Sequence, residues 1–144
     1  MKKLLFALLA VITLLSCGNS QNAKAQSAAK TTQKEYIEVL YFHGKQRCVT
    51  CNAIEKLTKE VLDKDFAQQV KDGKVVFKVI DISTKEGEKI ADKYEVTWSS
   101  LYINKWKDGK ETKNNMTDFG FSYAKSSPEV FKAGVKKKID ELLK

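Results

Sequence analysis

The stretch EYIEVLYFHGKQRCVTCNAIEKLTKEVL, residues 35–62, changes its hydrophobic period on either side of a pair of cysteines. Its first eight residues are rich in β-branched and aromatic side chains, which predicts a buried strand that Gly44 ends. After Cys51 the apolar residues recur at helical spacing and share one face, formed by Ile54, Leu57, Val61 and Leu62. We therefore expect a strand, a short loop, and a helix that begins at the two cysteines.

The middle of the sequence continues the alternation of helices and strands. Residues 65–72 predict a second helical piece with Phe66 and Val70 turned inward. Residues 75–82 form a nearly unbroken apolar run, which predicts a strand buried on both faces, as in the middle of a sheet. A short helix is expected over residues 86–94.

The last third predicts two strands and a helix. Residues 101–106 are expected to form a strand, and the Asp108–Gly109 turn joins it to an antiparallel partner at 111–113. Ser127 as N-cap and Pro128 in the first turn begin a final helix, whose buried stripe is Phe131, Val135, Ile139 and Leu142. The expected fold is α/β, a mixed central sheet of about four strands flanked by helices, with its first two strands parallel.

The chemical motif is Arg47-Cys48-Val49-Thr50-Cys51. A Cys-x-x-Cys between a strand and a helix is typical of a redox site, because the helix N-terminus stabilises the thiolate of the first cysteine. A structural disulfide and one half of a metal site are the alternatives. Zinc would need two further ligands, and His43 is the chain's single histidine. No resident metal or other cofactor is expected.

Over residues 35–144 the chain resembles the thioredoxin superfamily. The resemblance rests on the strand–CxxC–helix unit, the strand at 75–82, the 108–109 hairpin and the closing helix. It implies a thioredoxin-like fold in which Cys48 attacks a partner disulfide and Cys51 resolves the mixed disulfide. The implied partner is a protein disulfide or dithiol.

The sequence departs from the family pattern around this motif. Thioredoxins usually have Trp before the first cysteine and Gly-Pro between the two, whereas Arg47 and Val49–Thr50 stand here. The family also has a cis-proline facing the disulfide. The chain's single proline is Pro128, and Ser99 or Ser100 falls at the cis-proline position, so the peptide bond there is either trans or a costly cis non-proline bond.

The buried acid of the family's first strand is also missing, because Tyr41 or Leu40 stands at its place. Proton transfer to Cys51 would then need another group. His43 is a candidate proton shuttle, although a histidine at a strand end more often serves packing or hydrogen bonding.

Two further residues are candidates for tuning the cysteine pair. A fixed positive charge on Arg47 would lower the pKa of the Cys48 thiol; the alternative is a solvent-exposed loop cation. Trp98 is placed to cover the disulfide from the facing loop, but we favour partly buried packing for it, as for most large aromatic residues.

The N-terminus predicts export and lipid anchoring. Residues 1–16 combine a basic start with an apolar run of 12 residues, 4–15, which is too short to span a bilayer and is typical of a signal peptide. The sequence Leu14-Leu15-Ser16-Cys17 resembles a bacterial lipobox, in which Cys17 would be acylated. Residues 17–34 then form the lipidated cysteine and a flexible tether without large hydrophobic side chains. The absence of an acidic residue after Cys17 favours the outer membrane.

Charge and composition exclude several classes. The chain has 26 basic and 18 acidic residues, and removal of Lys2 and Lys3 leaves 24 minus 18, or +6. The lysines are scattered and no nucleic-acid-binding motif is present, so no nucleic-acid partner is expected. A chain of 144 residues with 10% aromatic residues fits one folded domain, which we expect to be monomeric.

These observations together predict a membrane-anchored thiol-disulfide oxidoreductase of the bacterial cell envelope, facing the periplasm and acting through Cys48 and Cys51. One alternative is a non-catalytic binding module of thioredoxin fold with a structural disulfide. A less favoured alternative is a soft-metal carrier, for example for copper(I), with two thiolate ligands.

Overall fold

The computed structural model describes residues 35–144, which fall within one compact unit. The predicted signal peptide and tether, with Cys17, lie outside the described residues. The elements are β1 (Glu35–His43), α1 (Val49–Asp65), α2 (Ala67–Lys71), β2 (Val75–Asp81), α3 (Lys85–Asp92), β3 (Ser100–Lys107), β4 (Lys110–Thr112), α4 (Thr117–Tyr123) and α5 (Pro128–Leu142). None of the helices within this range has the length and apolar character needed to cross a membrane.

The predicted mixed four-stranded sheet is confirmed. Its strand order is β2-β1-β3-β4, with β1 parallel to β2 and antiparallel to β3, and with β3 antiparallel to β4. The hairpin turn between β3 and β4 has positive φ at Asp108 and Gly109, as a tight turn of the primed type requires. The central strand is β1, whose residues 37–42 are all buried.

The prediction that β2 lies in the middle of the sheet is wrong. It is an edge strand, in which Val75 and Ile80 are buried while Lys78 and Val79 are exposed. An apolar run does not distinguish an edge strand from a central one, because an edge strand also buries part of both faces. The interior strands are β1 and β3, and both are largely buried.

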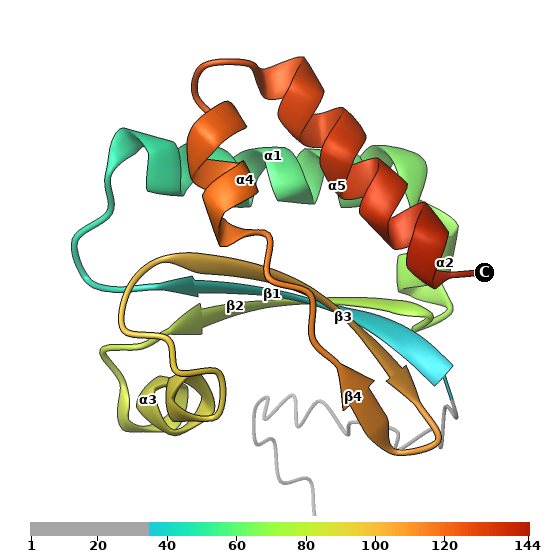
Figure 1. Cartoon of the computed structure of the whole chain (residues 1–144), viewed down its shortest axis with the longest axis horizontal. Helices are drawn as coiled ribbons and strands as arrows, with labels where there is room; N and C mark the ends of the chain where they lie inside the picture. Colours follow the sequence, from blue (N-terminus) through green and yellow to red (C-terminus); the bar gives the residue numbers. More distant parts are fainter. Residues whose placement is uncertain (1–34) are drawn as a thin grey trace, which may run out of the picture. The chain divides into compact units, whose positions relative to one another are not determined.

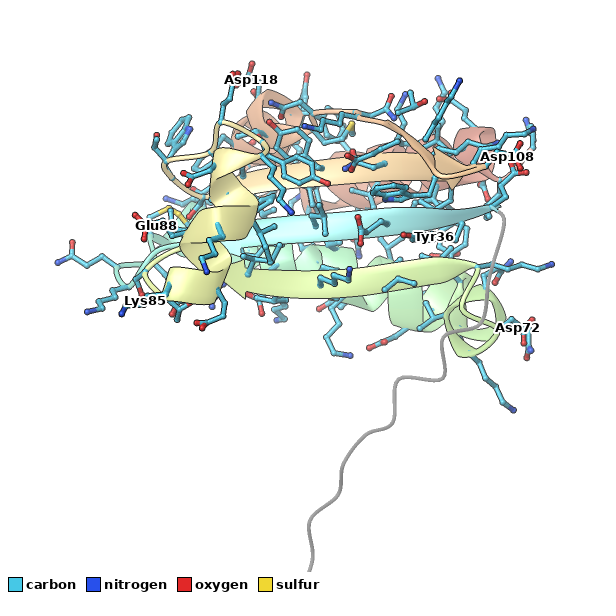
Figure 2. The ribbon with its side chains drawn as sticks, turned by 90° about the horizontal axis from the view of Figure 1, so that it is seen from below. Tyr36, Asp72, Lys85, Glu88, Asp108 and Asp118 are labelled. Carbon is cyan, nitrogen blue, oxygen red and sulfur yellow. A yellow bond between two sulfur atoms is a disulfide. The ribbon has the colours of Figure 1, made fainter. Side chains whose placement is uncertain are left out.

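Helices α1, α4 and α5 cover one face of the sheet, and α3 lies on the other (Figure 1). Alternate residues of β1 divide between the two cores: Ile37, Val39 and Tyr41 face α1 and α5, while Leu40 and Phe42 face α3. Seen from the α3 side, α3 crosses one end of the sheet, and Tyr36 lies toward the opposite end (Figure 2). The cysteine pair is at the start of α1, and so belongs to the face that α1, α4 and α5 cover.

The helices differ from the predictions in several places, and Leu142, predicted to be buried, is only half-buried. Phe66 is buried as predicted, but Val70 is exposed. Ser127 makes no side-chain capping hydrogen bond, although Pro128 does begin α5. Residues 119–123, for which no element was predicted, belong to α4, where Phe119 packs against Phe131 of α5. This helix brings Phe121 toward the cysteine pair.

Candidate redox site

Cys48 and Cys51 form a disulfide at the N-terminus of α1, with 5.0 Å between their Cα atoms. Cys48 is the N-cap, and its Sγ accepts a hydrogen bond of 3.0 Å from the backbone N–H of Cys51. The first turn of α1 contains no acidic residue, so the positive end of the helix dipole acts on this sulfur without a competing carboxylate. Cys48 is exposed and Cys51 is only 6% exposed. An incoming sulfur therefore reaches Cys48 first.

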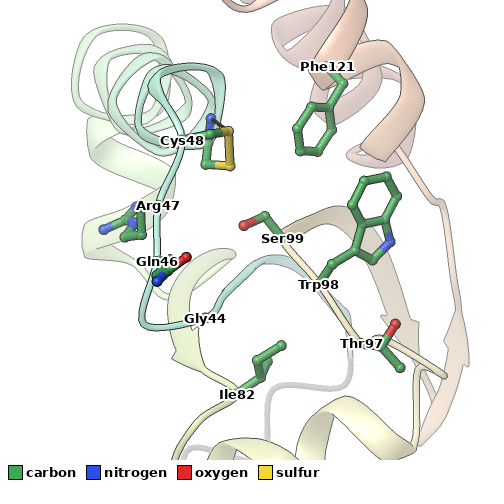
Figure 3. Close-up of a pocket in the computed structure, with 10 residues that line it drawn as sticks. Gly44, Gln46, Arg47, Cys48, Ile82, Thr97, Trp98, Ser99 and Phe121 are labelled. Carbon is green, nitrogen blue, oxygen red and sulfur yellow. Dashed lines mark hydrogen bonds between the residues drawn. A yellow bond between two sulfur atoms is a disulfide. The ribbon is translucent and has the colours of Figure 1, made fainter.

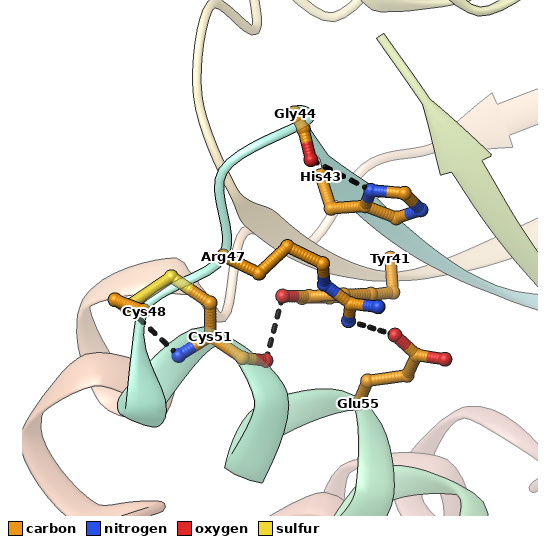
Figure 4. Close-up of a disulfide and its surroundings, with 7 residues drawn as sticks. All are labelled: Tyr41, His43, Gly44, Arg47, Cys48, Cys51 and Glu55. Atoms are coloured by element: carbon orange, nitrogen blue, oxygen red, sulfur yellow. Dashed lines mark hydrogen bonds and ion pairs between the residues drawn. A yellow bond between two sulfur atoms is a disulfide. The ribbon is translucent and has the colours of Figure 1, made fainter.

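Tyr41, near the end of β1, lies beside the disulfide and points its hydroxyl at the first turn of α1 (Figure 4). Its hydroxyl donates a hydrogen bond of 2.7 Å to the backbone carbonyl of Cys51. Burial raises the pKa of this phenol, although hydrogen bonding to Arg47 and Ser99 acts in the opposite direction. Of the two residues considered for the position of the family's buried acid, Tyr41 faces the disulfide and Leu40 faces α3. A neutral phenol can donate a proton in a hydrogen bond but is a poor base near neutral pH.

Arg47 is held in place by two neighbours. Its guanidinium forms an ion pair and hydrogen bond with Glu55 of α1, and its Cζ lies 5.6 Å from the centroid of the Tyr41 ring. Burial works to lower the pKa of Arg47, but hydrogen bonds to Glu55 and Tyr41 outweigh it and the net pKa is raised. Arg47 is therefore a fixed, half-buried cation and not a freely solvated one, and part of its charge is neutralised by Glu55.

An open cleft of about 710 Å³ runs past the disulfide. Figure 3 shows the disulfide and Arg47 on one side, Phe121 and Trp98 on the other, and Ser99 between them. The remaining lining residues are Gly44, Gln46, Ile82 and Thr97. Trp98 is stacked on Phe121, with ring centroids 5.3 Å apart and an interplanar angle of 13°. The preference for partly buried packing at Trp98 is wrong, because its side chain is 58% exposed.

The segment before β3, which contains Ser99 and Ser100, has an ordinary trans backbone. No peptide bond in the described part of the chain is cis, which decides between the two possibilities at Ser99 and Ser100. Ser99 is buried at the floor of the cleft. Ser100 begins β3, and its hydroxyl donates a hydrogen bond of 3.2 Å to the carbonyl of Trp98. This hydrogen bond ties the start of β3 to the Trp98 backbone.

The structure brings five of the predicted site residues to one cleft: Arg47, Cys48, Cys51, Trp98 and Ser99. Ser100 and His43 are outside its lining. His43 points along β1, where its Nδ1 donates a hydrogen bond of 3.0 Å to the carbonyl of Gly44. This contact is the local hydrogen bonding expected of a histidine at a strand end.

Two residues of the site were not identified from the sequence. Glu55, one turn after Cys51 on α1, turns to Arg47. A signal was present, because Glu55 follows Cys51 by four residues and so lies on the same helix face. Phe121 belongs to an aromatic segment whose spacing matched neither a strand nor a helix clearly.

Within residues 35–144, no group of three or more His, Cys, Asp or Glu side chains is arranged to hold a metal ion. The sulfur atoms of Cys48 and Cys51 are the soft donors of the cleft. Two thiolates alone would suit copper(I) better than zinc.

Comparisons with known proteins give weak similarities. A search of solved structures finds a malarial protein with 16% identity and a TM-score of 0.44, covering 72% of this chain and 97% of that one. It also finds a thioredoxin from Thermus thermophilus with 17% identity and a TM-score of 0.48, covering 75% of this chain and 74% of that one. No family model and no curated protein matches the chain.

Proposed function

Because the chain is a divergent thioredoxin-like protein with a cysteine pair at the start of α1, we propose that it is a thiol-disulfide oxidoreductase acting on partner proteins. The observation that carries the proposal is the asymmetry of the pair: Cys48 is exposed in an open cleft and its bonded partner Cys51 is buried. A purely structural disulfide does not need one sulfur accessible at a helix N-terminus. A redox pair does, because exchange requires attack along the S–S axis.

In the reduced protein, the Cys48 thiolate attacks one sulfur of a partner disulfide. A mixed disulfide forms and the first partner thiolate leaves. Cys51 then loses its proton and attacks the Cys48 sulfur, so the Cys48–Cys51 bond forms and the second partner thiolate leaves. Two electrons pass to the partner, whose two thiolates take up protons. A dithiol electron donor restores the reduced pair by the reverse exchange.

We also propose that the protein works at the bacterial cell envelope, anchored through Cys17. The support is the lipobox-like sequence that ends at Cys17 and the tether-like composition of residues 17–34. Two or more acyl chains, at about 0.8 kcal/mol per buried methylene, anchor a protein stably. Metabolic labelling with palmitate tests this directly: labelled wild-type protein is expected to partition into detergent, and Cys17→Ser is expected to remain unlabelled in the aqueous phase.

A second candidate, a binding module with a structural disulfide, is favoured by two observations. No proline faces the disulfide, and a neutral tyrosine occupies the place of the family's buried acid. In that case the cleft would bind a partner without exchanging electrons.

The reduction potential of the Cys48–Cys51 pair separates these functions. We expect residues 18–144, equilibrated in defined thiol buffers and assayed by alkylation mass shift, to titrate reversibly between about −120 and −270 mV. A potential below about −300 mV would indicate a structural bond and favour the binding module. A trapping experiment adds an independent result: Cys51→Ser should accumulate mixed disulfides through Cys48, whereas the matched Cys48→Ser variant should accumulate none.

A further inference from the structure

The aromatic pair opposite the disulfide is the part of the cleft that the exchange chemistry does not use. Trp98 precedes β3 and Phe121 comes from α4, yet their rings are nearly parallel with centroids 5.3 Å apart. Both residues line the same cleft as Cys48. Stacking on Phe121 holds the indole in a defined orientation while leaving 58% of the Trp98 side chain exposed. The two rings lie together on the side of the cleft opposite the disulfide (Figure 3), and more than half of Trp98 is open to solvent.

The charges around the cleft indicate what kind of group this surface receives. Among the described lining residues none is acidic, and Arg47 is the charged member. Its guanidinium already pairs with Glu55 and lies over Tyr41, so the cleft offers little free charge to an incoming side chain. Ile82 adds an aliphatic side chain to the lining. Gln46, Thr97 and Ser99 are polar but uncharged. The lining therefore favours a neutral group over a charged one, and the aromatic pair offers that group an apolar surface.

The position of the pair connects this preference to catalysis. A partner segment that exchanges with Cys48 must place its own sulfur in this cleft, and a residue next to that cysteine then lies within the space that Trp98 and Phe121 border. Offset or edge-to-face contacts between aromatic rings stabilise a complex beyond the area they bury. We propose that the cleft selects partner segments in which an aromatic residue flanks the reactive cysteine, with its ring packed on Trp98. This inference rests on the proposed exchange function and specifies its substrate class.

Two disulfide-bonded peptides test the proposal, identical except for tryptophan or serine beside the cysteine. The measured quantity is the rate constant for their reduction by the reduced protein, prepared in detergent as the chain that begins at Cys17. We expect the tryptophan peptide to react about 3- to 10-fold faster, the range that one aromatic contact supplies. Trp98→Ala is expected to bring the ratio of the two rates close to one. The control Tyr123→Ala, which removes an exposed aromatic side chain of α4 outside the cleft lining, should keep the wild-type ratio.

The remaining outcomes are distinguishable. Equal rates for both peptides with the wild-type protein, or an unchanged ratio in Trp98→Ala, would overturn the aromatic preference while leaving the exchange function intact. Failure to reduce either peptide would overturn the exchange function and the preference with it. Analytical sedimentation of the wild type and Trp98→Ala tests whether a second copy of the chain occupies the aromatic pair instead. A wild-type dimer that dissociates in the variant would show this, and would also overturn the proposal.

Discussion

The hydroxyl of Tyr41 donates a hydrogen bond of 2.7 Å to the backbone carbonyl of Cys51. This contact joins the central strand to the first turn of α1 directly behind the disulfide. Tyr41 is fully buried, and burial raises the pKa of its phenol. A group that stays neutral in this way anchors the start of α1 and does not accept a proton from Cys51. In the proposed exchange, the proton of Cys51 must therefore leave by way of solvent or a different residue.

Removing the hydroxyl by Tyr41→Phe is expected to reduce the free energy of unfolding of the oxidised protein by about 1 kcal/mol, the net value of one buried hydrogen bond. The ring and its packing stay in place, so a larger loss is not expected. Urea unfolding measures the difference. Tyr123→Phe is the matched control, because Tyr123 is exposed, and it should change stability by less than about 0.5 kcal/mol. Equal stability of Tyr41→Phe and wild type would contradict the anchoring role.

The ion pair between Arg47 and Glu55 predicts opposite effects of its two partners on Cys48. Arg47→Ala removes a cation next to the thiolate and should shift the pH midpoint of Cys48 alkylation upward. Glu55→Gln leaves the cation without its carboxylate and should shift the midpoint downward. Both shifts should shrink as salt is added, because Arg47 is only half-buried.

Alkylation rates with iodoacetamide across a pH series, in reduced protein with Cys51→Ser as background, give these midpoints. Lys59→Ala is a suitable control, since it removes a charge from the exposed side of the same helix. If the Arg47 and Glu55 variants share the wild-type midpoint, the pair has a structural role only.

The fold was largely predictable because its decisive signals are local. The strand before Gly44, the helical spacing after Cys51 and the Asp108–Gly109 turn each depend on neighbouring residues, and the structure confirms all three. The edge position of β2 was not predictable, because strand order depends on pairing between strands that are far apart in the sequence. Helix α4 was missed because seven residues with Gly120 in the middle give a weak helical pattern.

The cysteine pair of the site could be predicted from the sequence, but the residues that surround it could not. Spacing alone brings Cys48 and Cys51 together, since both lie within one turn of a helix. The contacts of Arg47 with Glu55, and of Trp98 with Phe121, join elements whose relative position only tertiary packing decides. Trp98 shows the limit most clearly: a general tendency of aromatic residues toward burial says nothing about one that borders a cleft.

Gly87 allows α3 to approach the end of β2. A Cβ added at this position would lie 1.9 Å from the carbonyl oxygen of Asp81, a backbone atom that cannot move aside cheaply. Gly87→Ala is therefore expected to destabilise the protein by about 1–3 kcal/mol, despite the gain of about 1 kcal/mol in helix propensity. Gly44→Ala is the matched control, because nothing lies within 4 Å of its added Cβ. Thermal unfolding should place Gly87→Ala clearly below this control; a variant as stable as the wild type would mean that α3 can shift without cost.

The raised pKa of Tyr94 predicts a loss of stability at alkaline pH. Burial and hydrogen bonding to the Glu111 carboxylate raise the pKa of this phenol well above its ordinary value of 10.0. Because the folded-state pKa is the higher one, the stabilisation is complete below the unfolded-state pKa near 10 and falls as the pH rises toward the folded-state value. The unfolded chain releases the proton first, so alkali favours unfolding.

Tyr94→Phe should accordingly flatten the decline in unfolding free energy between about pH 9 and about pH 11, measured by urea titration at each pH. Its stability at neutral pH is expected to be lower, because Glu111 loses the hydroxyl donor and keeps the Asn104 side-chain amide as its neighbour. The slope, and not the starting value, is therefore the test. Tyr36, Tyr41 and Tyr102 also have raised pKa values, so part of the decline remains in the variant. A slope identical to that of the wild type would show that the Tyr94 phenol ionises as readily in the folded protein as in the unfolded chain.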